Sequence, residues 1–135
     1  MRLKYLLDTN ACINYLNYPH AKVASVIRSI PLHEVAVCSV VKAELYFGSR
    51  KSRNPAINLG KQLQFLDQFK SLPFDDAAAE AYADIRADLT AKGSIIGPYD
   101  LQIAAIAVAN DLTLVTHNVS EFSRVGGLKI EDWEQ

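Results

Sequence analysis

The sequence predicts a single α/β domain in which helices cover both faces of a parallel sheet. Three short, mainly apolar segments have the composition of strands that are buried on both faces, namely residues 4–7, 35–38 and 112–115. Segments with helical spacing of apolar residues separate them. The 135 residues, half of them hydrophobic and 21% charged, suit one compact domain with a real core. Because no repeat, linker or low-complexity tract interrupts the chain, residues 1–135 are expected to form one domain.

Helices are predicted where apolar residues recur every three or four positions, with capping residues, glycine or proline at their ends. The first three expected helices are residues 11–16 after the capping triplet 8–10, residues 21–30 before Pro31, and a helix capped by Ser39 that carries Glu44. The next three are residues 59–69, residues 76–92 before Gly93, and a helix that opens at Gly97-Pro98. The last of these is apolar on nearly every face, which indicates burial against the sheet. Residues 72–74 are expected to be a short extended piece at a strand end or sheet edge, because they contain a proline.

Charge and hydropathy exclude several classes of function. The net charge is −1 and the pI is near 6.3, so any binding of nucleic acid must use a local patch. The densest basic stretch is 48–53, in which Arg50, Lys51 and Arg53 are candidate RNA contacts, although such a run is usually a solvated loop. No apolar run approaches the roughly 18 residues that span a bilayer, and Asp8 interrupts the N-terminal apolar segment before it could act as a signal peptide. A cytoplasmic protein without a membrane partner is expected.

The cysteines and histidines predict neither a disulfide nor a zinc site. Cys12 and Cys38 form no C-x-x-C pair and lie in apolar segments, so we expect two reduced, buried side chains. His20, His33 and His117 have no zinc-like spacing to one another or to the cysteines.

Four acidic residues stand at the edges of apolar segments. Asp8 follows the first strand, Glu44 lies about one helical turn beyond the second, and Glu121 follows the third by a short loop. Asp100 begins the buried helix that leads into the third strand. Because ligands of open parallel sheets sit beyond the carboxyl ends of the strands, we expect these acids to share one pocket.

Each acid also has a structural explanation. Asp8 could cap a helix, and Glu44 could pair with a neighbouring lysine on a helix surface. Asp100 in a first helical turn would complement the helix dipole, and Glu121 could simply be solvated. The functional interpretation therefore depends on the four acids occurring together.

A shared acidic pocket would favour cations. Two carboxylates about 4 Å apart repel by roughly 4 kcal/mol at an effective dielectric constant near 20. Several such repulsions either raise the pKa values or draw in cations, and all-oxygen ligands favour Mg²⁺ or Mn²⁺ over zinc. Such ions can activate a water for displacement at a phosphodiester. The sequence offers no evident Ser/His or Cys/His nucleophilic set and no Walker-type phosphate loop.

Four short blocks of sequence surround these acids. They are Leu6–Asn10, Ala43–Leu45 with Gly48, Gly97–Ala105, and Leu114–Asn118 with Glu121–Phe122. In this order and at this spacing they resemble PIN-domain ribonucleases, and more narrowly the VapC-type toxins of bacterial toxin–antitoxin pairs. The resemblance extends from Leu6 to Trp133, and the first and third blocks are its most specific parts. His117 departs from the motif, which often has Asn or Arg there, and we do not expect this to affect metal binding.

The resemblance implies a three-layer α/β/α fold around a short parallel sheet. It also implies an endoribonuclease that depends on Mg²⁺, for which Mn²⁺ substitutes, and that acts on transfer RNA or another structured RNA. The implied partners are a cognate VapB-type antitoxin and a second copy of the chain in a homodimer. The implied catalytic metal ligands are Asp8, Glu44, Asp100 and Glu121. The implied accessory polar residues are Thr9, Asn10, Thr116 and Asn118.

Two other functions remain open at this point. The first is a non-toxin nuclease of the same fold in RNA or DNA processing, which the short, insertion-poor chain disfavours. The second is a catalytically silent PIN module that acts as a binding scaffold, which the presence of all four acids disfavours. If the toxin interpretation is right, an antitoxin arginine is expected between Asp8 and Asp100, since its fork pairs bidentately with carboxylates.

Overall fold

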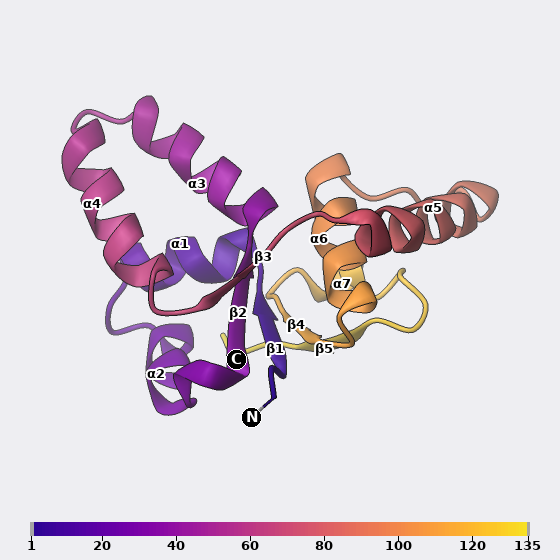
Figure 1. The fold of residues 1–135 in the computed structure, drawn as a ribbon, viewed down its shortest axis with the longest axis horizontal. Coiled ribbons are helices and arrows are strands. Elements are labelled where there is room, and N and C mark those ends of the chain that lie inside the picture. Colours follow the sequence, from indigo (N-terminus) through magenta and orange to yellow (C-terminus); the bar gives the residue numbers. More distant parts are fainter. Residues whose placement is uncertain (1, 135) are drawn as a thin grey trace.

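The computed structural model describes residues 2–134 and contains a five-stranded sheet between two groups of helices (Figure 1). All strand pairs are parallel, and the strand order is β3-β2-β1-β4-β5. The strands are β1 (Tyr5–Leu7), β2 (Val35–Cys38), β3 (Lys70–Leu72), β4 (Thr113–Val115) and β5 (Lys129–Glu131). The predicted α/β class with a short parallel sheet is therefore confirmed.

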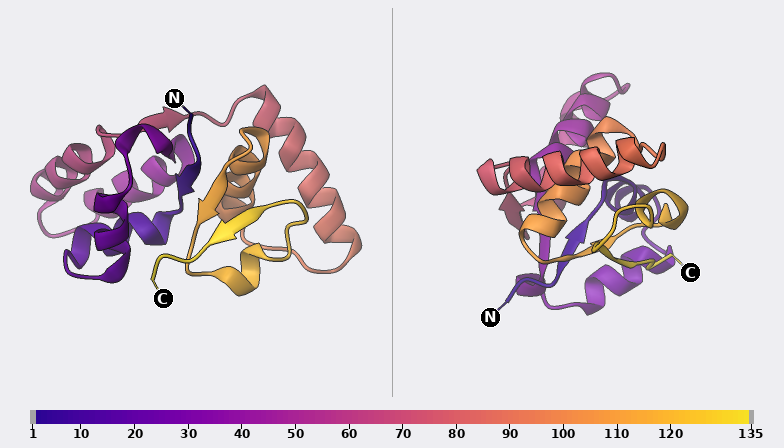
Figure 2. Two further views of the ribbon diagram at one scale, coloured as in Figure 1. Left: turned by 90° about the horizontal axis from the view of Figure 1, so that it is seen from below. Right: turned by 90° about the vertical axis from the view of Figure 1, so that its right-hand side faces the viewer.

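The helices divide into two layers, as Figure 1 and the left view of Figure 2 show. One layer consists of α1 (Thr9–Asn17), α2 (Lys22–Ser29), α3 (Ser39–Arg50) and α4 (Pro55–Leu66), with a 3-10 turn η1 (Leu32–Glu34) before β2. The other layer consists of α5 (Asp76–Ala91), α6 (Pro98–Ala109) and the single turn α7 (Val119–Phe122). Within residues 2–134, no helix is long and apolar enough to cross a membrane.

The order of the strands creates a switch point in the middle of the sheet. From β1 the chain moves outward through β2 to β3, and it then returns to place β4 and β5 on the other side of β1. Ligands of open α/β sheets bind at the carboxyl ends of the strands where the direction reverses, which is here between β1 and β4. The backbone N–H of Asp8 donates to the carbonyl of Val115 at 3.1 Å, so the ends of these two strands are held side by side.

The core fills the space between the sheet and both helical layers. The middle of helix α6, from Leu101 to Ala107, is largely buried, as its apolar sequence predicts, and the helix packs against α5, α3 and β4. Cys12 and Cys38 are free and buried, as predicted. Burial raises the pKa of Cys38 to about 11 and that of Cys12 well above its ordinary value, which keeps both thiols protonated.

Several element boundaries differ from those expected. Cys38, not Ser39, occupies the N-cap position of α3, and it makes no side-chain capping bond. Strand β3 ends one residue before Pro73, because proline has no N–H to donate to a neighbouring strand. Helix α4 begins at Pro55, in the first turn where proline is tolerated, and it ends at Leu66. The tail segment Lys129–Glu131, which the sequence does not mark as a strand, forms β5 at the edge of the sheet.

Candidate active site

Asp8 is a buried carboxylate at the switch point. Its side chain caps α1 by accepting a hydrogen bond from the Ala11 N–H at 2.8 Å, and it also forms a hydrogen bond with the Thr116 side chain. Asp8 is nevertheless only 3% exposed. Burial, reinforced by the charges of Glu134 and Glu44, raises the pKa of Asp8 to about 6, although the two hydrogen bonds act in the opposite direction. Capping is thus a real role of Asp8, but it does not account for the burial of a charge.

Asp100 and Glu121 form a coupled pair at the start of α6. Asp100 lies in the first turn of this helix, and burial, followed by the charge of Glu121 and a hydrogen bond to it, raises the pKa of Asp100 to about 6. Glu121 has a lowered pKa, because the Gly97 N–H donates to its Oε1 at 3.0 Å and the Asn118 side-chain amide donates to its Oε2 at 2.9 Å. In the absence of a cation, the proton of this pair therefore resides on Asp100.

Glu44 faces the same region from α3. The Thr9 hydroxyl donates to Glu44 Oε1 at 2.7 Å and thereby links the start of α1 to the middle of α3. The negative charge of Glu44 contributes to the raised pKa values of both Asp8 and Asp100. Asn10 is exposed on α1 and, among the residues that the structure describes, its side chain has no hydrogen-bond partner.

The loop between β4 and α7 connects Asp8 to Glu121 through hydrogen bonds. Thr116 is 1% exposed, and its hydroxyl accepts a hydrogen bond from the Asn118 N–H at 3.0 Å while it bonds to Asp8. Asn118 in turn bonds to Glu121. The polar residues predicted as accessory groups, with the exception of Asn10, therefore hold the carboxylates in place.

The four acids share one electrostatic environment without forming a closed cage. Between residues 2 and 134, no three of their carboxylates bring oxygen atoms within 4.8 Å of one another. Mg²⁺ is usually held by one or two carboxylates, several waters and the phosphates of a substrate. The four acids offer only oxygen ligands, which fits such an ion. Its positive charge would favour the ionised forms of Asp8 and Asp100, the two acids with raised pKa values.

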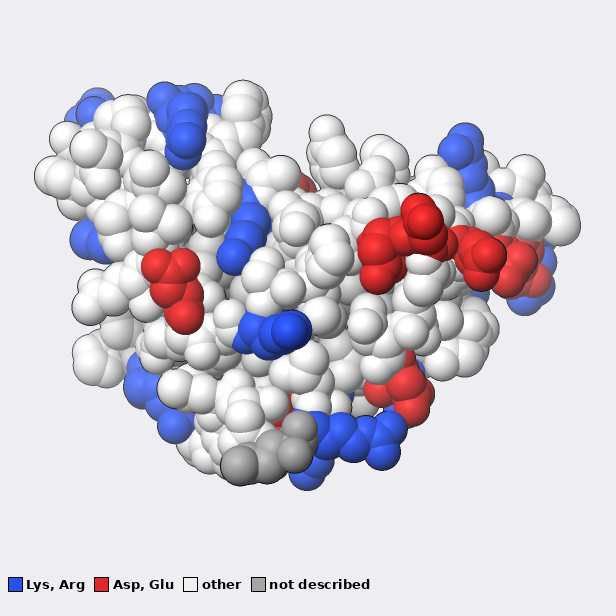
Figure 3. Space-filling model, in the orientation of Figure 1, with Lys and Arg blue, Asp and Glu red and all other residues white. Residues whose placement is uncertain are grey.

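The predicted RNA contacts lie at the outer end of α3. Lys51 lines a cleft of about 710 Å³ together with Thr9 and Glu44, and its Nζ lies 5.0 Å from the centre of the exposed Phe47 ring. Arg50 is exposed beside Tyr46, and Arg53 lies in the loop that follows α3. In Figure 3 basic side chains gather over this end of α3 and α4, whereas a row of acidic side chains crosses α5. Lys51 is about 10 Å from Glu44 along the helix axis, at 1.5 Å per residue.

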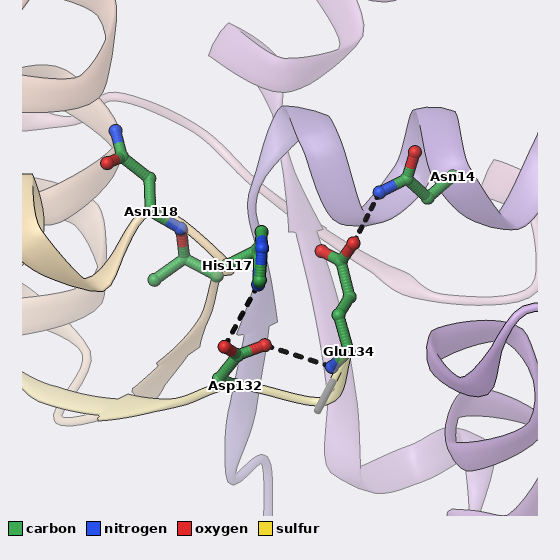
Figure 4. A network of polar contacts seen from close by, with 6 residues as sticks. Asn14, His117, Asn118, Asp132 and Glu134 are labelled. Atoms are coloured by element: carbon green, nitrogen blue, oxygen red, sulfur yellow. Dashed lines mark hydrogen bonds and ion pairs between the residues drawn. The ribbon is translucent and has the colours of Figure 1, made fainter.

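A further polar network, which the sequence does not indicate, surrounds His117 (Figure 4). His117 Nδ1 lies 3.0 Å from Asp132 Oδ2, the Glu134 N–H donates to Asp132 Oδ1 at 2.9 Å, and Asn14 Nδ2 donates to Glu134 Oε1 at 2.6 Å. Sequence spacing could not reveal this group, because Asp132 lies 15 residues beyond His117. The two residues meet because β5 pairs with β4 in parallel register.

The chain is similar along nearly its whole length to known nucleases. The sequence pattern of the PIN domain matches residues 5–128. The tRNA(fMet)-specific endonuclease VapC of Shigella flexneri is 41% identical over 97% of this chain and 98% of that protein. The protein of the same name from Salmonella typhimurium is 36% identical, again over 97% and 98% of the two chains.

Solved structures give the same result. A chain in the DNA-bound VapBC crystal structure from Salmonella typhimurium superposes with a TM-score of 0.92 at 36% identity, covering 97% of this chain and 98% of that one. A chain of the DNA-bound VapBC2 structure from Rickettsia felis has a TM-score of 0.89 at 34% identity, covering 97% and 99%. These similarities confirm the expected three-layer α/β/α fold.

Proposed function

The chain belongs to the PIN-domain family and, within it, to the VapC ribonucleases, and we propose that it is a Mg²⁺-dependent endoribonuclease that cleaves transfer RNA as the toxin of a toxin–antitoxin pair. The observation that supports this most strongly is the pair of carboxylates Asp8 and Asp100 at the switch point. Burial raises the pKa of both to about 6. A site that disfavours two ionised carboxylates at neutral pH is suited to a bound cation.

We assign the residues of the site as follows. Asp8 and Asp100 would hold the ion, with Glu44 and Glu121 completing the negative charge around it. Thr9 orients Glu44 through the 2.7 Å hydrogen bond between their side chains. A bound Mg²⁺, or Mn²⁺ in its place, would favour ionisation of a water and stabilise charge on the reacting phosphate.

The loop residues position the acids. Thr116 hydrogen-bonds to Asp8, and Asn118 fixes the carboxylate of Glu121. These bonds limit the movement of the carboxylates, so less reorganisation is needed when an ion and a phosphate arrive.

Transfer RNA is the substrate we propose, because two relatives that match nearly the whole chain are named for tRNA(fMet). The cleft beside Glu44 is lined by Lys51 and by two largely exposed aromatic rings, Phe47 and Tyr99. Aromatic rings stack on unpaired bases, and a lysine attracts phosphate. Arg50, in the last turn of α3, and Arg53, in the loop that follows, would extend the phosphate contacts.

The partner we propose is a VapB-type antitoxin, because similar chains occur in VapBC complexes. An antitoxin arginine between Asp8 and Asp100 would supply the positive charge that the site lacks and would compete with metal. Replacement of every arginine in the antitoxin tail should then abolish inhibition, and inhibition that persists would contradict this arrangement. We also propose a homodimer, which the family resemblance implies and which light scattering of the purified chain would test.

The nuclease proposal is tested by incubating purified protein with transfer RNA and Mg²⁺, with and without a chelator. Cleavage should stop in the chelator and resume with added Mg²⁺ or Mn²⁺. Asp8→Asn and Asp100→Asn should each lower the rate about 100-fold or more, because each removes a charge on which metal-assisted displacement depends.

An exposed acid outside the pocket provides the matched control. Asp88 on α5 forms an exposed ion pair with Lys92 at 3.0 Å, and Asp88→Asn should leave cleavage unchanged. Cleavage that survives the chelator, or that survives Asp8→Asn and Asp100→Asn together, would contradict the assigned mechanism. Intact transfer RNA combined with efficient cleavage of another RNA would change the substrate but not the chemistry.

A further inference from the structure

Two segments that are distant in the sequence bring three metal-binding side chains together beside the acidic pocket. His117 comes from the loop after β4, and Asp132 and Glu134 come from the tail after β5 (Figure 4). One nitrogen and two carboxylate oxygens of these residues all lie within 4.8 Å of one another. Across residues 2–134, no other group of three His, Cys, Asp or Glu side chains is so compact.

We propose that His117, Asp132 and Glu134 form a divalent transition-metal site, separate from the pocket of Asp8 and Asp100. Ligands of a tetrahedral Zn²⁺ ion, at 2.0–2.2 Å from the metal, are about 3.3 Å apart. The 3.0 Å between His117 Nδ1 and Asp132 Oδ2 is close to that separation. A small increase in the distance between His117 Nδ1 and Asp132 Oδ2 would let both atoms bind one ion. Glu134 would be the third ligand and water the fourth.

The ligand types distinguish this site from the one proposed for Mg²⁺. Imidazole nitrogen suits Zn²⁺, Ni²⁺ and Cu²⁺, whereas Mg²⁺ prefers oxygen ligands in octahedral geometry. The acids around Asp8 offer only oxygen. The two sites should therefore select different metals, and Zn²⁺ should prefer the group that contains His117.

The carboxylates of this group are held in place and lack a permanent counter-charge. Asn14 on α1 donates to Glu134 at 2.6 Å, and the Glu134 N–H donates to Asp132, so both carboxylates are oriented by groups that do not bind the metal. The Asp132 side chain is only 9% exposed. Within the described part of the chain, neither acid forms an ion pair with Lys or Arg, and His117 balances the charge only when it is protonated.

A metal at this position would join three parts of the fold. His117 lies between Thr116 and Asn118, which contact Asp8 and Glu121. Glu134 is bonded to Asn14 on the helix that Asp8 caps. Binding of the metal would therefore connect the C-terminal tail to the loop after β4 and to helix α1, both of which contribute to the acidic pocket. Saturating Zn²⁺ should raise the melting temperature Tm by about 5 °C.

The test measures Zn²⁺ binding by calorimetry and Co²⁺ binding by visible absorption, on a chain free of any affinity tag. The starting protein carries Asp8→Asn and Asp100→Asn, so that the acidic pocket does not contribute. We expect one Zn²⁺ per chain, and His117→Asn or Asp132→Asn should weaken binding at least 10-fold. His33, an exposed histidine 3.9 Å from Glu34, supplies the matched control, and His33→Asn should leave binding unchanged.

A second measurement avoids any dependence on how the variants fold. In the unsubstituted chain, Zn²⁺ should shift the NMR signals of the His117 ring while those of His20 and His33 stay in place. No stoichiometric binding of Zn²⁺ would overturn the proposal. Equal binding after His117→Asn, or a response of His33 in place of His117, would also overturn it.

Discussion

Replacement of the buried acid at the switch point should stabilise the metal-free protein. Asp8 is 3% exposed, and burial raises its pKa from 3.8 to about 6. The difference between these values corresponds to about 3 kcal/mol of unfolding free energy, at 1.36 kcal/mol for each pH unit. Asp8→Asn removes the charge but keeps the helix cap, because asparagine caps a helix about as well as aspartate. The variant should therefore be more stable at neutral pH by up to about 3 kcal/mol.

The direction of the pH dependence follows from the raised pKa. The folded chain binds the Asp8 proton more tightly than the unfolded chain, so protonation favours folding. This contribution is fully present below pH 3.8 and is lost as the pH rises through about 6. The advantage of Asp8→Asn should therefore be small near pH 4, grow between about pH 4 and pH 7, and remain constant above that range.

The assay is urea unfolding of both proteins in a chelating buffer at several pH values. Asp75→Asn is the matched control, because Asp75 caps α5 by the same kind of bond, to the Ala78 N–H at 3.0 Å, but is exposed. It should show no comparable gain as the pH rises. Mg²⁺ at about ten times its dissociation constant should raise the unfolding free energy of the unsubstituted chain by about 1.4 kcal/mol. The difference in stability between this chain and Asp8→Asn should therefore become smaller. The reasoning would be refuted if the gain in stability of Asp8→Asn did not depend on pH, or if Asp75→Asn showed the same gain.

Three further substitutions test the supporting contacts. Thr9→Val removes the 2.7 Å bond to Glu44 and should lower stability by about 1 kcal/mol in urea unfolding, while raising the Mg²⁺ concentration needed for half-maximal cleavage. Asn118→Ala releases Glu121, and metal titration of the cleavage rate should show about 10-fold weaker binding. Phe122→Ala empties a position that is 1% exposed beside the site and should cost about 3–5 kcal/mol of unfolding free energy, measured by denaturation.

The strands and the acids that follow them were predictable because local patterns specify both. Three of the five strands are mainly apolar, and capping or loop residues follow them directly. Asp8 could be placed at the carboxyl end of its strand from the sequence, and general rules for parallel sheets put Glu44 near the same edge. The sequence places Asp100 and Glu121 in the same pocket, but it does not predict the hydrogen bond between their side chains. This bond depends on how the start of α6 packs beside α7, which no local pattern records.

The tail could not be predicted for a related reason. Residues 129–131 are short and alternate in polarity, and they form β5 only because β4 offers a free edge. Without that pairing, nothing in the sequence relates His117 to Asp132. For the same reason, the sequence does not predict that the negative charge of Glu134 contributes to the raised pKa of Asp8. Long-range pairing, not composition, determines the polar surroundings of this pocket.

The presence of aspartate at position 8 is best explained by a need for negative charge. Capping alone would be served equally by asparagine, which would carry no charge into the core. Thr116 and the Ala11 N–H offset only part of the effect of burial, since the pKa of Asp8 remains raised. The metal-free fold is therefore less stable at neutral pH than it would be with a neutral cap. A bound cation, whether a metal ion or an antitoxin arginine, would reverse this effect, so occupancy of the site and stability of the fold should rise together.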